Sequence, residues 1–125
     1  MTKRSRQQGE LESAVLDALW DAQPTGKGLT SQEILDAVNE ATDSELALTT
    51  VLTVLTRLLD KGLVERQPAS GRGYLFNATS TREQHTAAML LEIVAGSDNP
   101  ALAFSHFANG LSPEALKALR QSLPD

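Results

Sequence analysis

The stretch from residue 48 to residue 78 constrains the fold more than any other part of the chain. Residues 48–61 carry apolar side chains at helical spacing, and Gly62 follows as a predicted left-handed stop. Two β-prone runs, residues 63–68 and 74–78, flank a glycine-containing turn, which predicts a β-hairpin. A helix that leads directly into a hairpin is the layout of a winged helix-turn-helix unit.

Two amphipathic helices are predicted before this stretch. Residues 9–21 repeat apolar side chains at helical spacing, and a loop containing proline and glycine follows. The second helix begins with a predicted capping box, in which the Thr30 hydroxyl bonds the Glu33 amide and the Glu33 carboxylate returns the bond. Polar residues 39–45 are expected to end this helix.

Three shorter helices are expected in residues 80–125. Asn99 before Pro100, and Ser112 before Pro113, are predicted to start the last two of them. Three short helices form an independent core only with difficulty, so a second copy of the chain is expected to cover their apolar side chains. The predicted dimer interface comprises Leu90, Leu91, Val94, Leu102, Phe104, Phe107, Leu116, Leu119 and Leu123.

The predicted fold class is therefore mainly α with a small β-hairpin. A basic flexible tail is expected at residues 1–8, a winged helix-turn-helix DNA-binding domain at residues 9–79, and a helical dimerisation domain at residues 80–125. Trp20 is expected in the core between the first helix and the wing.

The net charge of −5 by itself argues against nucleic acid, because binding to phosphates needs a basic surface. The charge is unevenly distributed, however. Residues 9–45 carry nine acidic side chains and one lysine, a net charge of −8, whereas residues 46–75 carry +2 and residues 1–8 carry +3. The third helix and the hairpin are thus basic parts of an acidic chain. The tail, with Lys3, Arg4 and Arg6, is expected to be disordered rather than bound to DNA.

Several classes of function are disfavoured by what the chain lacks. It has no cysteine, and its two histidines, His85 and His106, have no third partner at a spacing that suggests a metal site. The sequence shows no nucleophile elbow, phosphate loop or metal triad, so we expect neither enzymatic activity nor a cofactor. No apolar run suits a signal peptide or a membrane span, and we expect a cytoplasmic protein.

Four threonines lie in residues 48–61, although threonine is a mediocre helix former. An exposed threonine offers a hydroxyl and a methyl group on a short arm, which suits base edges, thymine methyl groups and phosphates. Ordinary solvent exposure is the alternative explanation for each of them. The predicted DNA-binding residues are Thr30, Ser31, Thr49, Thr50, Leu52, Thr53, Arg57, Arg66 and Arg72.

Some of these residues have a specific alternative. Leu52 is expected either to touch a thymine methyl group or to be partly buried. Arg57 is expected to reach a phosphate or to pair with Asp60 or Asp43. Arg72 and Arg66 either approach DNA from the wing or are solvated, and Thr30 is a helix cap that can also bind a phosphate.

Several motifs resemble the penicillinase repressors of the BlaI/MecI type, over roughly residues 9–123. The most specific is the third-helix run, with Thr49-Thr50-Val51 and then Leu55-Thr56-Arg57-Leu58. The others are Gly9-Glu10-Leu11-Glu12 with Val15, Leu19 and Trp20, then Lys61-Gly62-Leu63-Val64, the Gly71-Arg72 wing, and Leu111-Ser112-Pro113-Glu114. The resemblance implies a transcriptional repressor that dimerises through its C-terminal helices. It also implies that the repressor binds an inverted repeat of double-stranded operator DNA with TACA/TGTA-like half-sites.

The resemblance also implies a partner. Repressors of this family are typically inactivated when a membrane metalloprotease sensor, or a process it triggers, cuts the dimerisation domain at an Asn-Phe bond, and the family is associated with β-lactam resistance. This chain has no Asn-Phe pair, and the nearest comparable stretch is residues 103–107. Either cleavage does not induce it or another bond is cut. Copper-responsive relatives bind metal through C-terminal cysteines, which this chain lacks.

The leading hypothesis is therefore a homodimeric transcriptional repressor. The alternative is a winged-helix protein-interaction module without specific DNA binding. The acidic segment at residues 9–45 supports this alternative. An enzyme is the least supported of the three functions.

Overall fold

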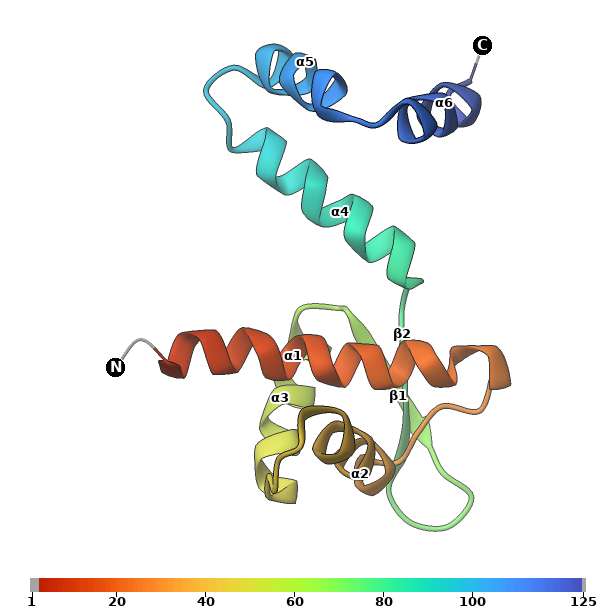
Figure 1. The fold of residues 1–125 in the computed structure, drawn as a ribbon. Coiled ribbons are helices and arrows are strands. Elements are labelled where there is room, and N and C mark those ends of the chain that lie inside the picture. Colours follow the sequence, from red (N-terminus) through yellow and green to blue (C-terminus); the bar gives the residue numbers. More distant parts are fainter. Residues whose placement is uncertain (1–2, 125) are drawn as a thin grey trace. The chain divides into compact units, whose positions relative to one another are not determined.

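The computed structural model describes the backbone of residues 3–124 and the side chains of residues 9–124. Three helices form its N-terminal part, with α1 lying across the other two (Figure 1). The three helices are α1 (Lys3–Ala22), α2 (Ser31–Thr42) and α3 (Leu48–Asp60), and a short 3-10 helix, η1 (Gln23–Thr25), follows α1. α2 and α3 also contact each other, so the three helices enclose a common interior.

α1 begins earlier than its apolar pattern predicts. The predicted start at Gly9 is wrong, because the backbone of residues 3–8, expected to be a tail, is helical. Lysine, arginine and glutamine are good helix formers, but they add no apolar stripe from which a helix can be recognised. The side chains of Lys3, Arg4 and Arg6 lie outside the described ones.

The ends of α2 and α3 are set by short-range hydrogen bonds. The predicted capping box is confirmed: the Glu33 amide donates to Thr30 Oγ1 over 3.1 Å, and the Thr30 amide donates to Glu33 Oε1 over 2.9 Å. At the end of α3, Gly62 has a φ of 75°, the left-handed conformation that favours glycine. The Leu63 amide donates to the Leu58 carbonyl over 3.0 Å, which completes a Schellman motif.

A two-stranded antiparallel hairpin follows α3. β1 (Val64–Pro68) pairs with β2 (Tyr74–Ala78), with Val64 opposite Ala78 and Pro68 opposite Tyr74. These bounds match the predicted strands to within one residue, so the predicted fold class, mainly α with a small hairpin, is confirmed.

The loop before α2 joins the hairpin as an additional bridge, which the sequence analysis missed. The Leu29 amide donates to the Phe76 carbonyl over 3.0 Å, and the Phe76 amide donates to the Leu29 carbonyl over 2.8 Å. Gly28 precedes the bridge with a φ of 74°, and a Cβ there would lie 2.9 Å from the Phe76 carbonyl oxygen and from Asn77 Nδ2. A Cβ at this position would therefore require the loop or the hairpin to shift.

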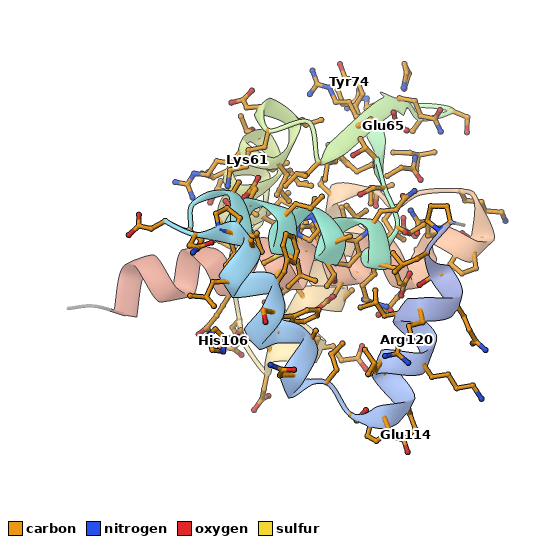
Figure 2. All side chains as sticks on the ribbon, turned by 90° about the horizontal axis from the view of Figure 1, so that it is seen from above. Lys61, Glu65, Tyr74, His106, Glu114 and Arg120 are labelled. Carbon is orange, nitrogen blue, oxygen red and sulfur yellow. The ribbon has the colours of Figure 1, made fainter. Side chains whose placement is uncertain are left out.

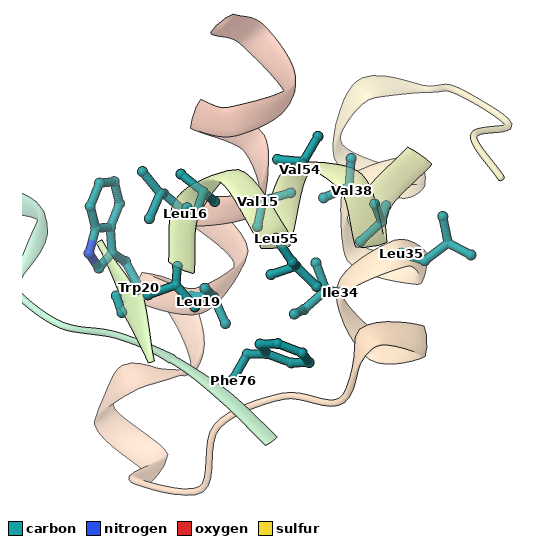
Figure 3. Packing of buried hydrophobic residues seen from close by; sticks show 14 residues of the cluster. Val15, Leu16, Leu19, Trp20, Ile34, Leu35, Val38, Val54, Leu55 and Phe76 are labelled. Carbon is teal, nitrogen blue, oxygen red and sulfur yellow. The ribbon is translucent and has the colours of Figure 1, made fainter. Parts of the chain in front are cut away.

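One apolar core holds these elements together (Figure 3). α1 contributes Val15 and Leu19, α2 contributes Ile34, α3 contributes Leu55, and β2 contributes Phe76. Trp20 is also in this core, as predicted, and its indole nitrogen donates to the Ser80 carbonyl over 2.9 Å. Every buried apolar residue of the described chain belongs to residues 15–78.

Three further helices complete the chain: α4 (Arg82–Ala95), α5 (Pro100–Gly110) and α6 (Pro113–Ser122). The contacts divide the chain into residues 1–82 and 83–125, where the sequence places the boundary after residue 79. The two predicted caps are confirmed, since Asn99 Oδ1 accepts from the Leu102 amide and Ser112 Oγ accepts from the Ala115 amide. No described residue of these three helices is buried.

Candidate nucleic-acid interface

One face of α3 presents polar side chains to solvent. Residues spaced three and four apart share a helix face, and this face carries Thr49, Leu52, Thr53, Thr56 and Arg57, with Asp60 at its C-terminal end, all exposed. The opposite face carries the buried residues Val51, Val54, Leu55 and Leu58. The structure thus brings four of the predicted DNA-binding residues together on what we call the α3 outer face. Thr56 belongs to this face but was not among the predicted residues.

The hydroxyl protons of two threonines on the α3 outer face are directed inward. Thr53 Oγ1 donates to the Thr49 carbonyl over 2.9 Å, and Thr56 Oγ1 donates to the Leu52 carbonyl over 2.9 Å. Each hydroxyl oxygen keeps lone pairs for an outside donor, and each side chain keeps its methyl group. In this conformation the two threonines suit the amino groups of adenine or cytosine and the methyl group of thymine better than they suit phosphates.

Leu52 and Thr50 differ in their accessibility. Leu52 is 40% exposed, so an apolar side chain stands within a mainly polar face. Thr50 is partly buried and is less accessible than the threonines of the α3 outer face. An exposed leucine suits contact with a thymine methyl group, which was one of the two alternatives for Leu52.

The turn between α2 and α3 is held by a residue that the sequence analysis treated only as part of a polar end. Asn39 Oδ1 accepts a hydrogen bond from the Leu46 amide over 2.8 Å, and Asn39 Nδ2 donates to the Leu46 carbonyl over 3.3 Å. This pair of bonds fixes the chain directly before α3, so Asn39 helps to orient the α3 outer face. Thr30 and Ser31, at the start of α2, are both partly buried.

The hairpin carries two exposed arginines. Arg72 lies in the turn between the strands, and Arg66 lies on β1. The guanidinium carbon of Arg66 stands 4.2 Å from the centre of the Tyr74 ring, a stacking contact across the two strands. Figure 2 shows Tyr74 on the hairpin, at the outer edge of its unit. Tyr74 was not a predicted site residue, because its contact with Arg66 depends on the strand register.

Part of the acidic charge of α1 is balanced within the fold. Lys61 Nζ lies 2.9 Å from Glu12 Oε1, and Arg82 Nη2 lies 3.2 Å from Asp21 Oδ1 and 3.4 Å from Asp17 Oδ1. The hydrogen bond to Asp21, followed by that to Asp17, raises the pKa of Arg82, while desolvation opposes the shift. Three of the four acidic side chains of α1 are thus paired with a basic residue.

The C-terminal helices expose a large apolar surface. Seven of the nine predicted interface residues are exposed, and Val94 and Leu116 are partly buried. Met89 and Ile93 of α4 are also exposed large apolar side chains, although the sequence analysis did not assign them to the interface. We call Met89, Ile93 and the nine predicted residues the C-terminal apolar surface.

Neither a metal site nor a membrane span is found in the part of the chain that the structure describes. There, histidines and acidic residues do not gather in a group of three that could hold an ion. None of the described helices is both long enough and apolar enough to cross a membrane.

Two comparisons place the chain among known proteins. The family model for the penicillinase repressor matches residues 8–125. The transcriptional regulator BlaI of Mycobacterium tuberculosis, from strain CDC 1551 / Oshkosh and from strain ATCC 25618 / H37Rv, is 30% identical over 122 residues. That alignment covers 94% of this chain and 83% of the relative. The family match includes α3, the hairpin and all three C-terminal helices.

Proposed function

Because the chain belongs to the penicillinase repressor family and is a transcriptional regulator of this type, we propose that it represses transcription as a homodimer bound to an inverted-repeat operator. The observation that carries the proposal is the α3 outer face. It places short polar side chains, one exposed leucine and one arginine on a single helix, and that helix is fixed to the core by its other face.

In this proposal the α3 outer face enters the major groove. Thr49 and Thr53 contact base edges from the first half of the helix, the end that usually points at the bases in helix-turn-helix proteins. Leu52 packs on a thymine methyl group between them. Thr50 supports the contact from its partly buried position.

Phosphate contacts surround this reading surface. Arg57, in the last turn of α3, and Arg72, at the tip of the wing, each reach a phosphate of the same half-site, and Arg66 contributes from β1. Thr30 and Ser31 contribute from the start of α2, where a helix N-terminus favours an anion. The Thr30 hydroxyl accepts its capping bond from an amide, so it retains a proton that it can donate to a phosphate.

The second copy of the chain binds through the C-terminal apolar surface. Two-fold pairing presents two reading units to an inverted repeat, so the symmetry of the protein matches that of the operator. It also covers apolar side chains that α4, α5 and α6 leave exposed.

Binding measurements on operator DNA test the proposal. The dimer is expected to prefer an inverted repeat over random DNA at physiological salt. Arg57→Gln and Arg72→Gln each remove one phosphate contact per subunit, so each is expected to make the slope of log affinity against log salt shallower by about 2 for the dimer. Arg120→Gln, on α6, is the control and is expected to leave the slope unchanged.

Absence of any preference for the inverted repeat would contradict the proposal and favour the protein-interaction module. A Thr53→Val variant sharpens the test, since it keeps the shape of the side chain but removes the hydroxyl acceptor. It is expected to change the base preference within the half-site, whereas the arginine variants weaken all sequences alike.

Induction by a membrane metalloprotease sensor is a further part of the proposal. The stretch nearest to the cleavage site of related repressors, residues 103–107, lies inside α5 (Pro100–Gly110). A protease binds its substrate in an extended form, so α5 would have to unwind locally before it is cut. N-terminal sequencing of the fragments from induced cells would identify the bond.

A further inference from the structure

The contact between Arg66 and Tyr74 joins two exposed side chains of the wing. Arg66 lies opposite Phe76, and Tyr74 lies opposite Pro68, so the two residues are diagonal neighbours on one face of the hairpin. Their separation, 4.2 Å from the guanidinium carbon to the ring centre, corresponds to direct stacking. Tyr74 remains 43% exposed, which is too accessible for a residue whose role is to fill the core.

The face of the hairpin that bears this pair is the one directed toward the core. Phe76 packs into the core from the same face, and α3 contacts β1. Arg66 and Tyr74 therefore continue this face beyond the edge of the core. Glu65, the neighbour of Arg66, points to the opposite face, since side chains alternate along a strand. Within the described residues, no ion pair engages Arg66.

Stacking restricts an arginine without using its hydrogen-bond donors. The guanidinium group has five N–H donors in its plane, and a ring packed on its flat face leaves all of them directed outward. A free arginine side chain carries about 2 kcal/mol of rotamer entropy, part of which is lost when it binds a phosphate or a groove edge. An arginine already held on a ring has less entropy to lose on binding.

We propose that Tyr74 is a positioning residue that holds the Arg66 guanidinium in an extended, stacked conformation, ready to contact the DNA backbone or the minor groove from the wing. The inference rests on the proposed function and deepens it. In this inference Arg66 contacts the DNA in a conformation that it already has in the free protein. Tyr74 affects binding by holding Arg66 and does not itself contact DNA.

A double-mutant cycle on operator affinity tests the coupling in the full-length chain. Tyr74→Leu keeps an apolar side chain but removes the ring, and it is expected to weaken binding about two- to fivefold per subunit, which corresponds to about four- to 25-fold for the dimer. Tyr74→Phe keeps the ring and is expected to bind within about twofold of the wild type. In an Arg66→Ala background, Tyr74→Leu is expected to have less than about a twofold further effect.

The cycle separates this inference from the proposed function. If the wild type prefers its operator but Tyr74→Leu weakens both backgrounds equally, Tyr74 contacts DNA itself and the inference is overturned. If the wild type shows no operator preference, the proposed function fails and the inference fails with it. The unfolding midpoint of each variant, followed by the fluorescence of Trp20, identifies any loss that comes from misfolding.

A measurement on the free protein tests the stacked conformation without DNA. A proton held over an aromatic ring has its NMR signal moved upfield, so the Arg66 side-chain protons are expected upfield in the wild type and in Tyr74→Phe. They are expected at ordinary positions in Tyr74→Leu. Equal positions in all three proteins would overturn the inference whatever the binding data show.

Discussion

In the N-terminal unit, Val15, Ile34 and Leu58 are 0% exposed, whereas in the C-terminal unit Leu91 and Ile93 are 64% and 69% exposed. Both units contain three α-helices, but the first buries its apolar side chains and the second exposes them. Residues 3–82 bury theirs within one chain, around three helices and a hairpin. Residues 83–124 leave theirs exposed, because three short helices offer too few partners to enclose them.

The difference indicates which part of the molecule depends on a partner. A unit with a buried core is expected to be stable in a single chain, and a unit with an extended exposed apolar surface is expected to be stable only when that surface is covered. In the proposed repressor, the unit that binds the operator is therefore stabilised by its own core, and the unit that pairs the subunits is stabilised by its partner. Substitutions in the two units test this division.

The largest effect is expected from a charge in the C-terminal apolar surface. Leu91→Glu would place a carboxylate in the proposed dimer contact, and the chain is expected to become monomeric by sedimentation. Without a linked second reading unit, operator affinity is expected to fall by about 100- to 10,000-fold. Glu92→Gln, one residue further along α4, is the control. A monomeric variant that kept its operator affinity would contradict the assignment of pairing to this surface.

A truncation in the N-terminal core is expected to have the next largest effect. Leu58→Ala removes a fully buried side chain, and it is expected to lower the free energy of unfolding by about 2–5 kcal/mol. Trp20 is the only tryptophan of the chain and lies in this core, so its fluorescence follows this unit. The loss is expected to be the same at all protein concentrations.

Leu102→Ala is the matched truncation in the C-terminal unit, where the leucine is exposed. It is expected to leave the Trp20 transition nearly unchanged and to shift the concentration at which the chain dimerises. The division between the units would be wrong if Leu102→Ala moved the Trp20 transition as far as Leu58→Ala does.

The features that could be predicted from sequence are those fixed by neighbouring residues. The capping box at Thr30 needs only four consecutive residues, and the Schellman motif at Gly62 needs only the end of one helix. The buried stripe of α3 and the limits of the hairpin follow from spacing alone in the same way. Local patterns of this kind are read directly from the order of the side chains.

Most of the features that were missed are contacts between different elements or across a loop. The bridge between Leu29 and Phe76 and the stacking of Arg66 on Tyr74 both require the register of the hairpin, which no local pattern states. Asn39 is one of several polar residues at the end of α2, and the sequence does not indicate that its side chain forms hydrogen bonds with the Leu46 backbone. The exposure of most residues on the α3 outer face could therefore be predicted, but the contacts that orient this face could not.

The loop before α2 provides a prediction on how the N-terminal unit is closed. Gly28→Ala and Gly26→Ala place a Cβ at nearly the same φ, 74° and 73°, and both are expected to be strained by about 1 kcal/mol or more. Only Gly28 has hairpin atoms within 3 Å of the added Cβ, so its substitution is expected to lower the unfolding free energy further. The difference between the unfolding free energies of the two variants, measured by Trp20 fluorescence, gives the contribution of the close approach between Gly28 and the hairpin. Equal losses would mean that the hairpin moves aside without cost.

The smallest effect is expected at the boundary between the two units, where Arg82 pairs with Asp17 and Asp21 of α1. These ion pairs are exposed to solvent, where screening makes such contacts weak. Arg82 also lies over the Trp20 ring, with its guanidinium carbon 5.4 Å from the ring centre. Arg82→Gln is expected to lower the Trp20 unfolding midpoint less than Gly26→Ala does, and the part of this loss that comes from the ion pairs is expected to vanish at roughly 1 M salt.

The chain before α4 has a second attachment that this substitution leaves in place. The Ser80 carbonyl accepts hydrogen bonds from Trp20 Nε1 over 2.9 Å and from Gln23 Nε2 over 3.0 Å. These bonds are partly buried and do not depend on salt in the way that exposed ion pairs do. Arg72→Gln removes the same charge from the wing and is the control, with no expected change in the midpoint. A large, salt-independent loss in Arg82→Gln would show that the N-terminal unit is not closed by its own core alone, which would weaken the contrast between the two units.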